Sequence, residues 1–315
     1  NLVGLSPALM FVVFCLMLFQ AFFAWSHQRA ELGKEPLLSL EVLDSPRERA
    51  TIVCLLVIGA LGPAVNFLIP LFIQIVQGRT SMQTAIAVIP YTLAIASSAI
   101  FIVRFYDRMT PRRIGVIAFS LVAGGLILLS FVVGNNWGTA MVIFGLLIVG
   151  FGEGSLLTLL FNVMVTSSPK SLAGDVGALR GMANNLSTAL GTAFAGVVAV
   201  GLLSLFILTD VSQSSLPLSL QSQVNLDNVN FISNDQLDDV MAQTTATPEQ
   251  ITEAVSINET ARLRALRASF LILGALALLA IFPAMGLPDY SPGDEPPPAT
   301  EAKSRARTRK KASAK

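Results

Sequence analysis

The sequence predicts an all-α polytopic membrane protein with seven transmembrane helices, from its composition, its long apolar stretches and the placement of its charges. Of its 315 residues, 53% are hydrophobic and 13% are charged, against about 25% charged in soluble domains. Each apolar stretch has the roughly 20 residues needed to cross a bilayer, where backbone groups must bond within a helix. The seven stretches are Leu5 to Trp25, Thr51 to Val76, Ala85 to Val103, Ile114 to Val133, Ala140 to Phe161, Leu186 to Leu208 and Ala268 to Gly286.

Local signals mark where several of these helices begin or bend. Thr110-Pro111 and Ser168-Pro169 each place a capping hydroxyl before a proline, the arrangement that starts a helix. Thr247-Pro248-Glu249-Gln250 adds a Gln three residues after the Thr, as in a capping box, so we expect a helix from Pro248 that runs into the last span. Within the second stretch, Pro63 and Pro70 each remove a helical donor and provide two kink points.

The charges predict how the chain crosses the membrane. Cytoplasmic loops carry an excess of Lys and Arg. Alternating the loops puts seventeen basic residues on one side and four on the other, Arg79, Arg262, Arg264 and Arg267. The segment from Thr209 to Ala261 carries eight acidic and no basic residues and lies on the side with four. We therefore expect a cytoplasmic C-terminus and a first span that starts outside.

Glu153 is the one charged residue within the seven apolar stretches. It lies in I-V-G-F-G-E-G-S-L-L, about 20 Å from the outer end of its span at 1.5 Å per residue. Gly150, Gly152 and Gly154 flank it and allow close approach of a helix or a substrate. Desolvation favours the uncharged form of a carboxyl group, which suits a proton-coupling role. The alternative is a neutral acid bonded to a neighbouring helix with no transport role.

Other polar side chains within or near the spans are candidates to line a polar cavity. Asn66 lies between the two prolines of its span, and broken helices line cavities. For any single amide the alternative is interhelical adhesion worth about 0.6 kcal/mol. The candidates are Asn66, Gln74, Tyr91, Asn162, Asn184 and Asn185.

Enzyme and cofactor chemistry lacks its residues in this sequence. The only histidine, His27, lies outside the spans, so no histidine-based metal cluster or zinc helix can be assembled. No span contains the lysine that a retinal Schiff base requires. We therefore expect a protein that is not an enzyme, with no metal and no cofactor.

Three stretches resemble the major facilitator superfamily, in particular the C-terminal half of the fourteen-helix drug:proton antiporters. The first is P-L-F-I-Q-I-V-Q-G from Pro70 with A-V-I-P-Y from Ala87. The second is R-F-Y-D-R-M-T-P-R-R from Arg104. The third is V-G-F-G-E-G-S-L-L with L-A-G-D-V-G-A-L-R-G. The resemblance covers nearly the whole chain.

The resemblance implies a division of the chain. Residues 1–26 would be the last extra linker helix and residues 27–50 a cytoplasmic link. Residues 51–286 would be a six-helix transport bundle of three-plus-three inverted repeats, with an external loop at 209–261. Residues 287–315, rich in Pro and then in Lys and Arg, would be a disordered basic tail that contacts anionic lipid and binds no nucleic acid. Since the chain begins at Asn1 and then enters a span, we expect a fragment that lacks its N-terminal half.

The Arg104 to Arg113 loop resembles the family's cytoplasmic signature G-x-x-x-D-R-x-G-R-R. Asp107 matches the acid, and Arg108, Arg112 and Arg113 match basic positions of a gate that ties helix ends together. The family's two glycines are Val103 and Thr110 here, and a basic turn that only sets topology is the alternative.

Together these features predict a secondary-active transporter of the plasma membrane, the inner membrane of a bacterium. It would export amphipathic drugs or metabolites against proton entry by alternating access. The alternative is a membrane scaffold or accessory subunit that binds partners through the external segment or the tail.

Overall fold

A computed structural model describes residues 7–32, 46–106, 108–134, 138–167, 173–214, 237, 239, 241 and 247–289, and the regular elements described there are all helices. Six of them are long and apolar enough to cross a membrane, in agreement with the predicted all-α polytopic fold. The helix α1 (Pro7–Glu31) carries a shorter apolar stretch, Met10–Ser26. The seventh span therefore stays a prediction.

The helix α2 (Pro46–Leu71) passes through Pro63 and Pro70 before its geometry changes. It continues as a π-helical segment, η2 (Phe72–Val76), directly after the second proline. Because a proline donates no backbone hydrogen bond, Pro63 and Pro70 leave the carbonyls of Gly59 and Asn66 without their helical donors. The expected irregularity is present as a change of helix type at the C-terminal end of α2.

The next two helices begin at threonines. The helix α3 (Ser81–Phe105) starts with a capping box that was not predicted. The Thr80 N–H donates to Gln83 Oε1, and the Gln83 N–H donates to Thr80 Oγ1 at 3.3 Å. The helix α4 (Pro111–Val132) begins at the predicted proline. The Thr110 side chain makes no capping bond, so this part of the prediction is wrong.

The helices α5 (Ala140–Ser167) and α6 (Ala173–Ser212) cross in opposite directions. The predicted sixth span began at Leu186, whereas α6 begins at Ala173. Asp175 and Arg180 make the first turns of α6 polar, so the helix begins before the apolar stretch does. Ser168-Pro169, predicted to start this helix, lies outside the described residues.

The last helices are α9 (Pro248–Leu279) and the short α10 (Ile281–Ala284). The expected capping box is present: the Thr247 N–H donates to Gln250 Oε1 at 2.9 Å and the Gln250 N–H donates to Thr247 Oγ1 at 3.4 Å. The helix then runs into the last apolar stretch without a break, as predicted. Parts of the expected external loop are therefore helical, because α6 ends at Ser212 and α9 starts at Pro248.

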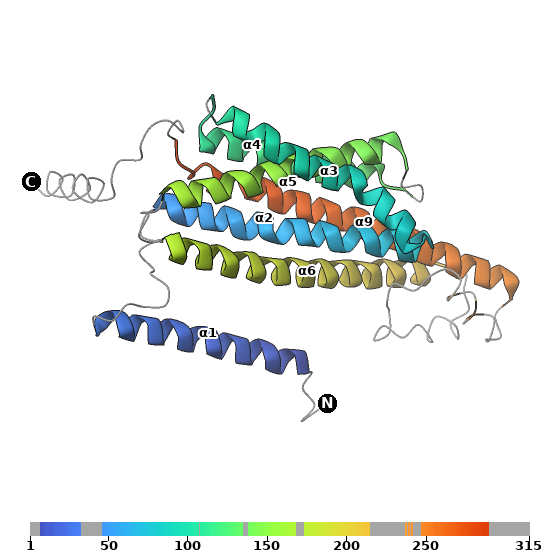
Figure 1. Cartoon of the computed structure of the whole chain (residues 1–315). Coiled ribbons are helices and arrows are strands. Elements are labelled where there is room, and N and C mark those ends of the chain that lie inside the picture. The colour runs from blue at the N-terminus through green and yellow to red at the C-terminus, as the bar shows by residue number, and fades with distance from the viewer. Residues whose placement is uncertain are drawn as a thin grey trace, which may run out of the picture.

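Packing around α5 organises the six-helix bundle (Figure 1). The helix α5 contacts α2, α3 and α4, while α6 packs on α2 and α9. In the expected inverted repeat, α2, α3 and α4 correspond to α5, α6 and α9. The contact of α3 with α5 would then correspond to the contact of α6 with α2. The helix α1 stands apart beside α6, and its side chains from Met10 to Ala21 are exposed.

Candidate functional site

Glu153 lies at the middle of α5 and is the only charged residue of that helix. Its side chain is 6% exposed. The residues around the carboxyl group come from α2 and α3, and we call the group Gly62, Asn66, Tyr91 and Glu153 the α2–α3–α5 junction. A carboxyl group at this depth is stable only where protein groups replace water as its hydrogen-bond partners.

Two neutral polar side chains complete the junction. The Tyr91 hydroxyl donates to Glu153 Oε2. The amide of Asn66 donates to Tyr91 Oη at 3.3 Å and to the backbone carbonyl of Gly62 at 3.0 Å. Three of the predicted site residues, from three helices, thus form one hydrogen-bonded chain.

Glycines let these helices approach closely enough to form the junction. A β-carbon on Gly62 would lie 2.8 Å from Glu153 Cδ and nearer still to Oε1, so the carboxyl group occupies the space that a side chain would fill. A β-carbon on Gly154 would lie 2.8 Å from Ile95 Cα of α3. One on Gly152 would lie 2.8 Å from the Ala118 carbonyl oxygen of α4. The glycines around Glu153 thus admit neighbouring helices, as expected.

The other cavity candidates lie away from this junction. Gln74, in η2, and Asn162, near the end of α5, are exposed. Asn184 and Asn185 are exposed on the first half of α6. Thr188 is exposed one turn further along the same helix. At the junction, Glu153 and Tyr91 are buried, while Asn66 is exposed like these other polar candidates.

The predicted gate loop joins α3 to α4. Asp107 lies outside the described residues, while the side chains of Arg108, Arg112 and Arg113 are exposed. The backbone N–H of Arg112 donates to the Pro288 carbonyl at 3.1 Å and ties the start of α4 to the chain just after α10. The loop thus joins the ends of neighbouring helices through a backbone bond, and its arginine side chains remain on the surface.

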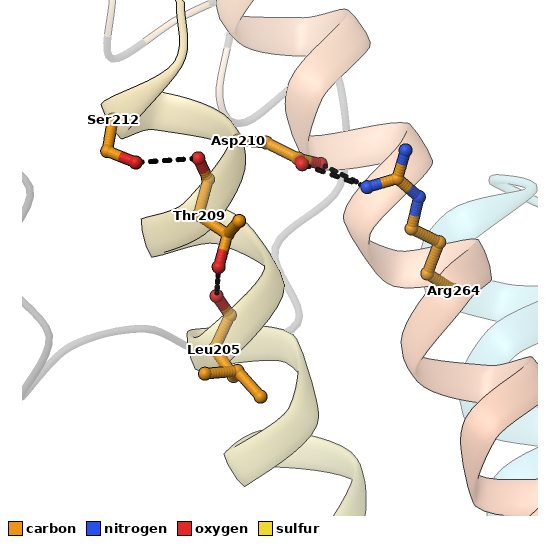
Figure 2. A network of polar contacts seen from close by, with 5 residues as sticks. All are labelled: Leu205, Thr209, Asp210, Ser212 and Arg264. Atoms are coloured by element: carbon orange, nitrogen blue, oxygen red, sulfur yellow. Dashed lines mark hydrogen bonds and ion pairs between the residues drawn. The ribbon is translucent and has the colours of Figure 1, made fainter.

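A polar contact between α6 and α9 was not among the predicted sites (Figure 2). Arg264 forms an ion pair with Asp210 at 2.9 Å. The hydroxyls of Thr209 and Ser212 donate to carbonyls of their own helix, each at 2.8 Å. We call the contact of Asp210 with Arg264 the external α6–α9 pair. From the sequence these two residues belong to one long polar segment, and nothing in their spacing indicates that they meet.

Arg262 is a second charged residue that is buried, although the sequence analysis counted it among the loop charges on the external side. Its side chain is fully buried, and Nε donates to the Asn258 carbonyl one turn earlier at 3.2 Å. Nearby, Arg267 Nε donates to the Val133 carbonyl at the end of α4 at 2.9 Å. Both arginines donate to backbone carbonyls near the C-terminal end of α4 and in the first half of α9. Their charge alone could not distinguish this role from an exposed one.

No cluster of three or more His, Cys, Asp or Glu side chains that could hold a metal occurs in the part of the chain that the structure describes. The polar groups of the junction are instead a carboxyl, a phenol and an amide. Such a set can hold and release a proton without any further group.

Comparison with known proteins places these features in a family. The sequence profile of the Major Facilitator Superfamily matches residues 2–192. A "Tetracycline resistance determinant" of Streptomyces rimosus is 30% identical over 159 residues, which is 45% of this chain and 45% of that protein. A "Putative multidrug resistance protein MdtD" of Pectobacterium carotovorum is 24% identical over 199 residues, 62% of this chain and 41% of that protein. The chain thus matches a little under half the length of each relative.

Proposed function

This chain belongs to the Major Facilitator Superfamily, and on that premise we propose that it is the C-terminal half of a transporter that exports amphipathic compounds in exchange for protons. The family is one of secondary transporters, and the six long apolar helices make this a multi-pass membrane protein. The two relatives are named for resistance to tetracycline and to multiple drugs, which supports a drug-like substrate. The partner of this half would be an N-terminal half of the same transporter.

Glu153 is the proposed proton carrier, and its hydrogen-bonded burial is the observation that carries the proposal. Export driven by proton entry requires a group that accepts a proton from outside and releases it inside. A carboxyl group in mid-membrane can do so if the protein stabilises both of its forms. Burial favours the neutral form, and the Tyr91 hydroxyl, a hydrogen-bond donor, stabilises the ionised form.

The exposed polar side chains would line the substrate cavity together with the other half. Asn184, Asn185 and Thr188 lie along α6 among apolar residues that are also exposed. Polar side chains at lipid depth face a bundle interior or a watery cavity. A facing N-terminal half would supply that interior, and Gln74 and Asn162 would join it from η2 and α5.

The gate loop and the orientation complete the proposal. We assign Asp107, Arg108, Arg112 and Arg113 to a cytoplasmic gate whose contacts differ between inward-open and outward-open states. The exposed arginine side chains are available to such contacts. The protein would lie in the inner membrane of a bacterium with its C-terminus in the cytoplasm, where the basic tail meets anionic lipid.

Proton-driven transport in inside-out membrane vesicles tests the proposal. The complete transporter carrying Glu153→Gln is compared with wild type and with Glu249→Gln, an exposed acid at the start of α9. The substrate is tetracycline, the compound in the name of the first relative. We expect Glu153→Gln to abolish accumulation driven by a pH gradient and Glu249→Gln to retain it. Accumulation at the wild-type level by Glu153→Gln would remove this residue from the coupling mechanism.

A further inference from the structure

The hydrogen-bond chain at the junction has a fixed direction. A backbone carbonyl can only accept, so the Asn66 atom that contacts the Gly62 carbonyl must be the amide nitrogen. The same nitrogen lies 3.3 Å from the Tyr91 oxygen, which must therefore accept. The single hydroxyl proton of Tyr91 is then directed to Glu153 Oε2. From Asn66 through Tyr91, both side-chain to side-chain bonds are donated in the direction of the carboxyl group.

This direction fits the ionised carboxylate, which can only accept hydrogen bonds. A carboxyl group protonated at Oε2 must instead donate. The Tyr91 oxygen would then accept from Glu153, and its own proton would turn towards Asn66. When Asn66 accepts this proton, its amide rotates and presents Oδ1, which withdraws the nitrogen from the Gly62 carbonyl. One proton is gained at Glu153, and otherwise only hydrogen bonds are exchanged.

The carbonyl that loses its side-chain donor belongs to an already weakened part of α2. Gly62 and Asn66 lie between Gly59 and Pro70, where two prolines provide no backbone N–H. The π-helical segment η2 begins two residues after Pro70. Helix bends concentrate at such positions, because fewer backbone bonds resist them. A change at the Gly62 carbonyl therefore acts where α2 bends most easily.

The groups that face Glu153 from the packed helices include one titratable side chain. α2 presents Gly62 and Asn66, α3 presents Tyr91, and α4 packs on the adjacent Gly152 through Ala118. The charged α6 residue that contacts α5 is Arg180, 3.8 Å above the Phe161 ring. That ring lies about 12 Å from Glu153 along the helix axis. Among the described residues, Tyr91 is thus the titratable partner through which a proton at Glu153 is sensed.

We infer that Tyr91 and Asn66 are positioning residues that transmit the protonation state of Glu153 to α2 between Pro63 and Pro70. The inference rests on the proposed role of Glu153 in proton coupling. It makes the phenol and the amide a relay that links one proton to the shape of a helix. Their effect is exerted through Glu153 and α2, without contact with the transported compound.

Tyr91→Phe in the complete transporter tests the relay, with transport in vesicles measured as a function of pH. Without the hydroxyl the Glu153 carboxyl group loses its link to Asn66 and α2. We expect the pH of half-maximal transport to shift by about one unit, a tenfold change in proton concentration. Tyr106→Phe is the matched control. Tyr106 is also a buried tyrosine, but it lies at the C-terminal end of α3, whereas Tyr91 lies within that helix. We expect it to retain the wild-type pH profile.

Asn66→Ala is the second variant and leaves the Tyr91 hydroxyl in place. The expected shift is in the same direction and smaller, because only the donor that fixes the Tyr91 proton is lost. A wild-type pH profile in both Tyr91→Phe and Asn66→Ala, or an equal shift in Tyr106→Phe, would overturn the relay. If Glu153→Gln abolishes coupling while these profiles stay unchanged, the relay alone fails. Should Glu153→Gln retain coupling, the proposed function fails and the relay with it.

Discussion

The α2–α3–α5 junction and the external α6–α9 pair satisfy polar groups in two different ways. At the junction the buried Glu153 carboxyl group is bonded to the buried Tyr91 phenol, which in turn accepts from the exposed Asn66 amide. The external pair joins full charges, Arg264 and Asp210, whose side chains are 52% and 17% exposed. Water can complete the solvation of the second contact, whereas every partner of the first must come from the protein. Substitutions should therefore cost more at the junction than at the pair.

Enlarging Gly154, the glycine that follows Glu153, is expected to have the largest effect on stability. A β-carbon on Gly154 meets the α3 backbone, so Gly154→Ala should lower the free energy of unfolding by about 1–3 kcal/mol. The matched control is Gly124→Ala on α4, where a β-carbon meets nothing within 4 Å. It should leave stability unchanged or raise it by up to about 1 kcal/mol. Equilibrium unfolding in detergent measures both, and equal effects would show that close helix approach is not what the junction requires.

Loss of the capping box at the start of α9 should have the next largest effect on stability. Thr247 Oγ1 accepts from the Gln250 N–H, so Thr247→Ala should cost about 1 kcal/mol. Because this helix start is exposed, the loss should appear as faster hydrogen exchange in the first turn of α9. The control is Thr110→Ala, since Thr110 makes no capping bond at the start of α4. Faster exchange at the start of α4 alone would contradict the assignment of these caps.

The sequence predicted most of the helices because their signals are local. Span length, the Pro111 start and the capping box at Thr247 each depend on a few adjacent residues. The apolar stretch from Leu186 marks only part of α6, because Asp175 and Arg180 make its first turns polar although the helix continues through them. A hydropathy pattern detects where a helix meets lipid and misses where it extends beyond the bilayer.

The site could be predicted only in part. A lone acid among apolar residues identified Glu153, and prolines drew attention to Asn66. That Tyr91 completes the chain, and that Gly62 makes room for the carboxyl group, depends on contacts between three helices far apart in sequence. The same limit applies to Arg262, which was counted with the loop charges and is fully buried.

Removal of the Tyr91 hydroxyl should change the stability of the junction less than either substitution above. Hydrogen bonds between transmembrane helices contribute about 0.6 kcal/mol on average. Tyr91→Phe should therefore lower the free energy of unfolding by about that amount while the ring keeps its packing. Unfolding at a fixed pH measures it. A loss of several kcal/mol would mean that the hydroxyl supports the fold more than the state of Glu153.

The external pair should show the smallest effect. Exposed ion pairs contribute about 0–1 kcal/mol and are screened by salt. In a double-mutant cycle of Asp210→Ala and Arg264→Ala, we expect a coupling energy below about 0.5 kcal/mol that declines further at high salt. A coupling larger than the cost of Tyr91→Phe would reverse the ranking of the two regions.

The proposed proton coupling requires an exchangeable proton on Glu153. Infrared difference spectroscopy between acidic and alkaline pH tests for this proton most directly. The purified complete transporter should show a protonated-carboxyl band that disappears as the pH rises. This band should be absent in Glu153→Gln and should disappear at a different pH in Tyr91→Phe. An unchanged band in Glu153→Gln would contradict the account, since the exchangeable proton would then reside on another acid.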